Sequence, residues 1–172
     1  LGLASFHASN SVIVDDTIYT GKKIVIATGS RPASLEVPGI EKVKQYNNES
    51  IFEARDLPKR ILVVGGGPIG IEIGQAIHRL GCSVAIVHRG PNILPHDDHE
   101  IAAILFERLK AEGIKFIMNS EVREFTSDTE AIVINKEGST STVSFDALFV
   151  AVGRCVDLAS LNLNKAGISV AN

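Results

Sequence analysis

The chain has 172 residues, a formal net charge of −3, 45% apolar residues and 22% charged residues, a composition that suits a globular protein with a buried core and excludes a disordered chain. No basic field is present to bind a nucleic-acid backbone, and no run reaches the roughly 18 consecutive apolar residues of a membrane helix. Cys82 and Cys155 form neither a disulfide framework nor a C-x-x-C motif, so we expect a reduced, cytoplasmic setting.

The first third of the chain contains short segments with a strand-like pattern. Ser11–Val14 and Thr17–Thr20 predict the two arms of a hairpin. Lys22–Ala27 is rich in β-branched residues and predicts a buried strand. The polar stretch 42–50 predicts a linker with turns, and Glu49–Ala54 predicts one or two helical turns.

Three apolar runs in the middle of the chain alternate with two helical patterns. Ile61–Val64, Ser83–Val87 and Ile114–Met118 have the composition of strands that are buried on both faces. The first helix is expected to run from Ile71 to Leu80, with an apolar face made of Ile69, Ile73, Ala76, Ile77 and Leu80. This order of elements predicts a parallel α/β sheet.

The second helix is expected to begin at Asp97-Asp98, which supply an N-cap, and to end after Glu112. Its predicted apolar face consists of Ile101, Ile104, Leu105 and Leu109. His96 and His99 flank the cap. We interpret them as part of this helix start and predict no metal site, because no further ligand spacing supports one.

The pattern changes after Met118. Three short alternating runs separated by polar turns predict a small antiparallel meander, with arms at Glu121–Phe125, Ala131–Asn135 and Thr142–Phe145. Ala147–Val152 is again fully apolar and predicts a late strand that extends the parallel sheet.

A glycine motif of the form G-x-G-x-x-G joins the first buried strand to the first helix, as Gly65, Gly67 and Gly70. In this context Gly65 permits a tight turn, Gly67 lets a pyrophosphate approach the backbone, and Gly70 lets helix and strand pack closely. The free N–H groups at the helix start would face the anion. The alternative is a glycine-rich turn that binds no ligand.

The residue that selects between the two nicotinamide dinucleotides is expected about 20 residues further on, where an acidic side chain takes the ribose 2′-hydroxyl. Here the second strand ends in His88-Arg89. No carboxylate repels a 2′-phosphate, and Arg89 can pair with one, which favours NADPH. The alternative is that both residues are solvated and that NADH binds through other contacts.

Four motifs together resemble the pyridine nucleotide-disulfide oxidoreductases. Ala27–Pro32 is similar to the ATG-S-x-P motif of that family, Val37–Ile40 to its linker, Gly65–Glu72 to its NAD(P) fingerprint, and Ala151–Arg154 to its return into the FAD domain. The glycine motif and the Arg79–Gly81 segment are most similar to the mercuric-reductase-like and dihydrolipoamide-dehydrogenase-like branch.

The resemblance implies the domain organisation. The expected fold is an α/β, Rossmann-like NAD(P)-binding domain over residues 57–150, with the antiparallel meander inside it. Residues 1–40 are expected to form the C-terminal part of a FAD-binding segment, 41–56 a linker, and 151–172 the return into the FAD domain. The chain is expected to be the central fragment of a longer polypeptide, because both ends read as interrupted patterns.

The resemblance also implies the binding residues. Ala4, Thr28, Gly29 and Arg154 would lie against FAD. Glu72 would lie near the nicotinamide, and Val122 and Gly153 would line the NAD(P) site. The expected set around the dinucleotide is completed by Gly65, Gly67, Pro68, Ile69, Gly70, His88 and Arg89. Pro68 stands where many members carry an aromatic gate over the flavin.

The function that the resemblance implies is electron transfer from NAD(P)H through FAD to a disulfide or an Hg(II)-type acceptor, in a homodimeric full-length enzyme. The chain contains no C-x-x-x-x-C redox pair, so we assign no catalytic residue and expect no activity and no retained FAD in this chain alone. Two alternatives stay open: an NADH oxidase or peroxidase type of flavoprotein, and a non-catalytic dinucleotide-binding module.

Overall fold

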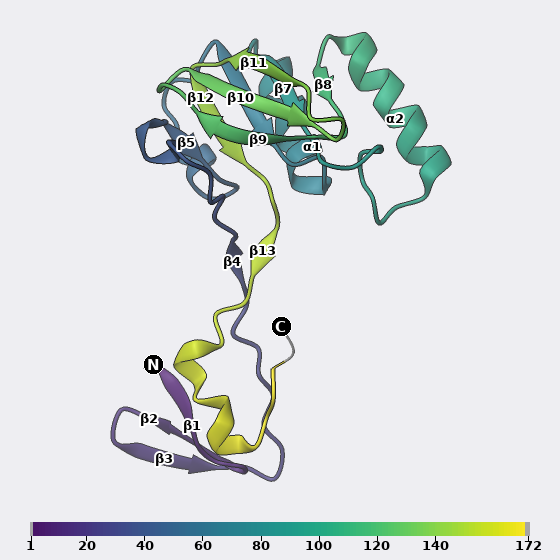
Figure 1. Cartoon of the computed structure of the whole chain (residues 1–172). Coiled ribbons are helices and arrows are strands. Elements are labelled where there is room, and N and C mark those ends of the chain that lie inside the picture. The colour runs from purple at the N-terminus through teal and green to yellow at the C-terminus, as the bar shows by residue number, and fades with distance from the viewer. Residues whose placement is uncertain (1, 171–172) are drawn as a thin grey trace. The chain divides into compact units, whose positions relative to one another are not determined.

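The computed structural model describes residues 2–170 and divides them into two compact units (Figure 1). The first unit consists of the chain up to Arg31 together with the chain from Arg154 onward, and the second unit is Pro32–Gly153. The chain passes between them at β4 (Arg31–Pro32) and at β13 (Arg154–Cys155).

A five-stranded parallel sheet forms the centre of the second unit. Its order is β5-β12-β6-β7-β8, and every neighbouring pair is parallel. The strands are β5 (Gln45–Tyr46), β6 (Arg60–Val64), β7 (Ser83–Val87), β8 (Lys115–Ile117) and β12 (Ala147–Val150). The predicted α/β class, the three sequential strands and the late fourth strand are confirmed.

The strands of this sheet end in register. Val64, the last residue of β6, pairs with Val87 at the end of β7 and with Val150 at the end of β12. The loops that follow these three strands therefore leave the sheet at one edge, which is where parallel α/β sheets bind their ligands.

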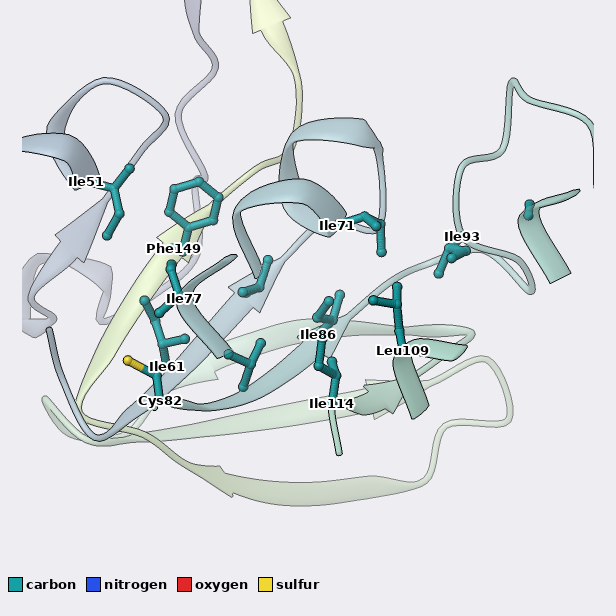
Figure 2. Close-up of a cluster of buried hydrophobic side chains, with 13 residues drawn as sticks. Ile51, Ile61, Ile71, Ile77, Cys82, Ile86, Ile93, Leu109, Ile114 and Phe149 are labelled. Carbon is teal, nitrogen blue, oxygen red and sulfur yellow. The ribbon is translucent and has the colours of Figure 1, made fainter. Parts of the chain in front are cut away.

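Two helices cover one face of the sheet, α1 (Pro68–Arg79) and α2 (His99–Glu112). They enclose a buried apolar cluster (Figure 2) whose labelled members include Ile61, Ile86 and Phe149 from the sheet and Ile77 and Leu109 from the helices. Aliphatic side chains from helices and strands thus interdigitate in one layer, which is the packing expected of a buried parallel sheet.

A second layer covers the other face of the sheet. It is an antiparallel meander of order β11-β10-β9, as predicted, made of β9 (Ser120–Phe125), β10 (Glu130–Asn135) and β11 (Thr140–Ser144). Along β6, Ile61 and Val63 belong to the helix-side cluster and Leu62 and Val64 to the meander-side cluster. This alternation explains why the strand is apolar at every position.

The predicted contact faces of both helices are partly wrong. In α1 the buried residues are Gly70, Ile71, Gly74 and Ile77, whereas Leu80 is 73% exposed and Ala76 is also exposed. The reason is that glycines form part of the contact. A Cβ at Gly74 would lie 3.3 Å from Ile86 Cδ1, so the helix backbone itself packs against the sheet. A prediction based on apolar side chains does not include glycine and therefore places the contact face incorrectly.

In α2 the contact with the sheet is made by Ala102, Leu105 and Leu109. Ile101 and Ile104 lie outside this contact and are 66% and 69% exposed.

The predicted start and end of α2 are confirmed. The Asp98 side chain accepts hydrogen bonds from two backbone N–H groups of the first turn, a cap that stabilises a helix by about 1 kcal/mol.

The stretch 41–56 is part of the folded second unit. It contributes β5, the edge strand of the parallel sheet, and two 3₁₀ turns, η1 (Ile40–Lys42) and η2 (Ser50–Glu53). Ile51 is buried in the helix-side cluster. The predicted helical turn near residue 50 is confirmed, and the strand beside it was not predicted because its exposed residues are polar.

The first unit is small. Strands β1 (Ala4–Ala8), β2 (Ser11–Val14) and β3 (Thr17–Thr20) form an antiparallel sheet, which confirms the predicted hairpin. Two 3₁₀ turns, η3 (Ala159–Leu161) and η4 (Leu163–Ala166), pack on it through Leu161, Leu163 and Phe6.

The predicted buried strand at Lys22–Ala27 is wrong. Within residues 2–170 this segment pairs with no strand, Val25 is 85% exposed, and Ile26 is 41% exposed. A β-branched run becomes a strand only where another strand takes up its backbone hydrogen bonds.

Glu112 joins α2 to α1. Its carboxylate accepts hydrogen bonds from Arg79 (2.9 Å), Gln75 (3.1 Å) and Arg108 (3.2 Å). The hydrogen bonds from Arg79 and Gln75 are the main causes that lower the pKa of Glu112 to about 2. The charged carboxylate is therefore favoured in the folded state.

We expect Glu112→Gln to remove a pH-dependent part of the stability. Because the folded-state pKa is depressed, the contribution of the carboxylate is complete above pH 4.5, the ordinary glutamate value, and is lost as the pH falls towards about 2. Urea unfolding of both proteins between pH 7 and pH 3 measures this. The difference in unfolding free energy should shrink on acidification. Glu107→Gln, which removes only an exposed pair with Lys110, is the matched control, and a difference that stays constant with pH would contradict the expectation.

Candidate functional site

In the glycine turn between β6 and α1, the first and last glycines of the motif, Gly65 and Gly70, have no room for a side chain. Gly65 has φ +118°, its N–H donates to the Val87 carbonyl at 2.9 Å, and a Cβ there would lie 2.2 Å from the Ala151 carbonyl oxygen. A Cβ at Gly70 would lie 2.0 Å from the Gly65 carbonyl oxygen. Strands β6 and β12 and helix α1 thus meet at a point where backbone contacts backbone.

Gly67 differs from both of these glycines. A Cβ built on it meets no atom within 4 Å, and its φ is −79°. The space in front of this residue is therefore open, although its backbone conformation suits any residue. A glycine is needed here only if something else approaches the backbone.

Helix α1 begins directly after Gly67 and has no side-chain cap. Pro68 occupies its first position, and its first backbone bond is the Ile71 N–H to the Gly67 carbonyl at 3.0 Å. The first N–H groups of a helix have no acceptor inside it and carry the positive end of the helix dipole. The open side of Gly67 thus adjoins N–H groups suited to a phosphate.

The middle of the turn is held from both sides. The Gly66 N–H donates to His88 Nδ1 at 3.2 Å, and the Gly66 carbonyl accepts the Leu94 N–H at 2.8 Å. Leu94 has φ +49°, uncommon for this residue. Sequence reasoning missed the roles of Leu94 and Ala151. No sequence pattern shows that a leucine such as Leu94 will adopt a positive φ. Nor does a pattern show which carbonyl, here that of Ala151, will contact a glycine.

The structure brings most of the predicted dinucleotide residues to one edge of the sheet. Gly65–Gly70 follow β6, His88 and Arg89 follow β7, and Gly153 lies three residues beyond β12. Arg89 is exposed, whereas His88 is only 9% exposed. Glu72 lies in the second turn of α1 and is exposed.

Val122 lies two residues beyond Ser120, whose N–H donates to the His88 carbonyl. It is on β9, and its side chain is buried in one cluster with Val64, Val87 and Val150. Val122 is 7% exposed, so it offers a ligand little surface.

The residues predicted to contact FAD belong to the first unit and are exposed: Ala4, Thr28, Gly29 and Arg154. Arg154 Nε donates to Ser30 Oγ at 2.7 Å, and its Nη2 donates to the Ser30 carbonyl. Gly29 has φ +72°, and a Cβ there would meet nothing within 4 Å. Ala4 lies on the paired strand β1, whereas Arg154 begins β13, which pairs with β4.

Other features of the described residues lie away from this edge. A groove of about 970 Å³ is lined by strand residues such as Arg60 and Lys115 and by Phe106 of α2, and none of the predicted binding residues lines it. Cys82 is buried in the helix-side core, and burial raises the pKa of its thiol. Within residues 2–170 no helix has the length and apolar character to cross a membrane, and no three potential ligand side chains gather as a metal site would need.

Comparison with known proteins identifies the family. The family model described as "Pyridine nucleotide-disulphide oxidoreductase" matches residues 2–172. The chain belongs to this family. Members of the family depend on FAD and use NAD(P)H.

Individual members of the family are similar over nearly the whole chain. A mercuric reductase of Lysinibacillus sphaericus is 31% identical and a dihydrolipoyl dehydrogenase of Thermus scotoductus 34% identical, over 97% and 98% of this chain. The solved structure of the HOCl-induced flavoprotein disulfide reductase RclA from Escherichia coli is 29% identical, covers 99% of the chain and has a TM-score of 0.81. The chain spans 31%, 38% and 39% of the lengths of these three proteins.

Two alanine substitutions separate the structural glycine from the open one. Gly65→Ala is expected to lower the free energy of unfolding by about 2 kcal/mol or more, because the backbone conformation is strained for alanine and the Cβ collides with the Ala151 carbonyl. Gly67→Ala is expected to lower it by no more than about 1 kcal/mol, since nothing lies within 4 Å of the Cβ and only the preference of the N-cap for glycine over alanine is lost. Chemical denaturation measures both. Equal destabilisation by the two substitutions would contradict the close contact at Gly65 and the open space at Gly67.

Proposed function

We propose that this chain is the NAD(P)H-binding portion of an FAD-dependent oxidoreductase that passes electrons from NAD(P)H through FAD to a disulfide or an Hg(II)-type acceptor. The observation that carries the proposal is the glycine turn, in which Gly65 and Gly70 are closely packed while Gly67 faces open space beside a helix start. Family membership supports the same assignment.

The residues of the turn suit the pyrophosphate of a dinucleotide. The backbone N–H groups of Gly67, Ile69 and Gly70 would bind it, because Pro68 between them has no N–H and no side chain at Gly67 blocks the approach. Arg89 would lie at the adenosine end and Glu72 near the nicotinamide, and Val122 and Gly153 would line the NAD(P) site. The chemistry that the dinucleotide supplies when bound is hydride transfer to the flavin.

The first unit would contribute to the flavin site. We assign Ala4, Thr28, Gly29 and Arg154 to it, with Arg154 oriented by its hydrogen bonds to Ser30. None of the described residues is assigned a proton-transfer or nucleophilic role. The part played by this chain is to bind and orient, and the acceptor would react elsewhere in the full-length protein.

The names of the relatives favour an enzyme that reduces a disulfide or a metal ion over an NADH oxidase or peroxidase type of flavoprotein. The similar proteins are named mercuric reductase, dihydrolipoyl dehydrogenase and flavoprotein disulfide reductase. We therefore propose a disulfide or metal-ion acceptor for the full-length protein, and with it a homodimer and a cytoplasmic location.

Arg89→Gln tests the assignment of the adenosine end. If Arg89 pairs with the 2′-phosphate, the dissociation constant for NADPH should rise about tenfold and that for NADH by less than about twofold. Titration calorimetry with both dinucleotides measures this. Arg55→Gln, an exposed arginine on the segment that precedes β6, is the control and should change neither constant. Equal weakening for NADPH and NADH would contradict the assignment.

We expect the isolated chain to bind no FAD that survives gel filtration. The 172-residue sequence contains one G-x-G-x-x-G motif, which is assigned to NAD(P)H, so no second motif is present in it to bind the pyrophosphate of FAD. The measurement is the flavin absorbance band of the protein peak after incubation with excess FAD. A stoichiometric band would show that the first unit forms a complete flavin site.

A further inference from the structure

His88 stands where an acidic residue is expected to face the ribose, but its ring is turned inward. The side chain lies between two glycines of different loops. A Cβ at Gly66 would be 2.9 Å from His88 Cγ, and a Cβ at Gly90 would be 2.9 Å from His88 Nε2. The backbone of His88 is fixed as well, because its N–H donates to Ile117 and its carbonyl accepts from Ser120. The ring therefore occupies a slot beneath the glycine turn.

The hydrogen bond to the turn defines the protonation state of this ring. Nδ1 accepts the Gly66 N–H at 3.2 Å, so Nδ1 carries no proton and the neutral ring must carry its hydrogen on Nε2. Burial lowers the pKa of His88, the Arg89 charge acts in the same direction, and a backbone interaction with Asn92 opposes them. Nε2 is buried and has no hydrogen-bond partner within residues 2–170.

The consequence for the turn follows from the planarity of the peptide bond. The peptide that joins Gly65 to Gly66 is held through its N–H by His88, and the peptide that joins Gly66 to Gly67 is held through its carbonyl by Leu94. In a trans peptide the N–H points away from the carbonyl. Leu94 therefore sets the direction of the Gly67 N–H, the first of the groups assigned to the pyrophosphate, and His88 holds the preceding peptide, from which this part of the turn continues.

We propose that His88 is a positioning residue for the dinucleotide: as the neutral Nε2–H tautomer it accepts the Gly66 amide and holds the glycine turn in the form that presents its N–H groups to the pyrophosphate. The inference rests on the function proposed above and adds to it, because it moves His88 from the ligand contacts to the support beneath them. Arg89 is then the charged group at the end of β7 that is left for the ligand.

Two variants of the whole chain distinguish positioning from mere space filling. His88→Asn keeps an acceptor, Oδ1, close to the place of Nδ1, whereas His88→Phe keeps the ring and loses the acceptor. We expect the dissociation constant for NADH to rise about three- to tenfold in His88→Phe, the loss of one hydrogen bond, and to stay within about twofold of the native value in His88→Asn. NADH is the probe because it lacks the 2′-phosphate assigned to Arg89. Native-like affinity in His88→Phe, or equal weakening in both variants, would overturn the inference.

A second measurement on the native, ligand-free chain depends on no variant. Long-range ¹H–¹⁵N correlation spectra of the histidine rings should show His88 with an unprotonated Nδ1 and a protonated Nε2. A protonated Nδ1 would overturn the inference. If the ring shows the expected tautomer while neither NADH nor NADPH binds, the contact between His88 and the turn stands and the proposed function is contradicted, so the two failures are distinguishable.

Discussion

The second unit depends on a point where three backbones meet without an intervening side chain. Gly65 contacts the Ala151 carbonyl and Gly70 contacts the Gly65 carbonyl, at distances that no Cβ allows. This contact brings the start of α1 against the ends of β6 and β12, and the apolar clusters on both faces of the sheet pack around that arrangement. Gly67, in the same turn, faces open space, which is why we propose the junction as the dinucleotide site.

Much of this could be predicted from the sequence, because local rules govern it. The apolar run before Gly65, the motif spacing, the cap at Asp98 and the alternation in β9 and β10 depend on neighbours along the chain, and the structure confirms those elements. The predictions that are wrong depend on distant neighbours. Lys22–Ala27 lacks a pairing strand within residues 2–170, and the faces of α1 and α2 follow from contacts with the sheet, in which Gly74 serves as a packing surface.

His88 illustrates the same limit at the candidate site. Its position in the sequence marks it as the residue at the end of the second strand, where a ligand contact is the ordinary interpretation. Which way the ring points is decided by Gly66 and Gly90, since only residues without a Cβ leave room for an imidazole between them. Neither glycine could be connected with His88 before the fold was known. We therefore propose that His88 supports the glycine turn and does not contact the dinucleotide. Arg89 keeps its proposed role as a contact to the dinucleotide.

The central claim is that the N–H groups around Gly67 bind the pyrophosphate of a nicotinamide dinucleotide. The most direct measurement is a titration of the ¹⁵N-labelled chain with NADPH, followed by the amide resonances. We expect the largest shifts at Gly67, Ile69 and Gly70, with smaller shifts at Arg89. Shifts confined to the groove beside Phe106 and Lys115, or no shift at a saturating concentration, would contradict it.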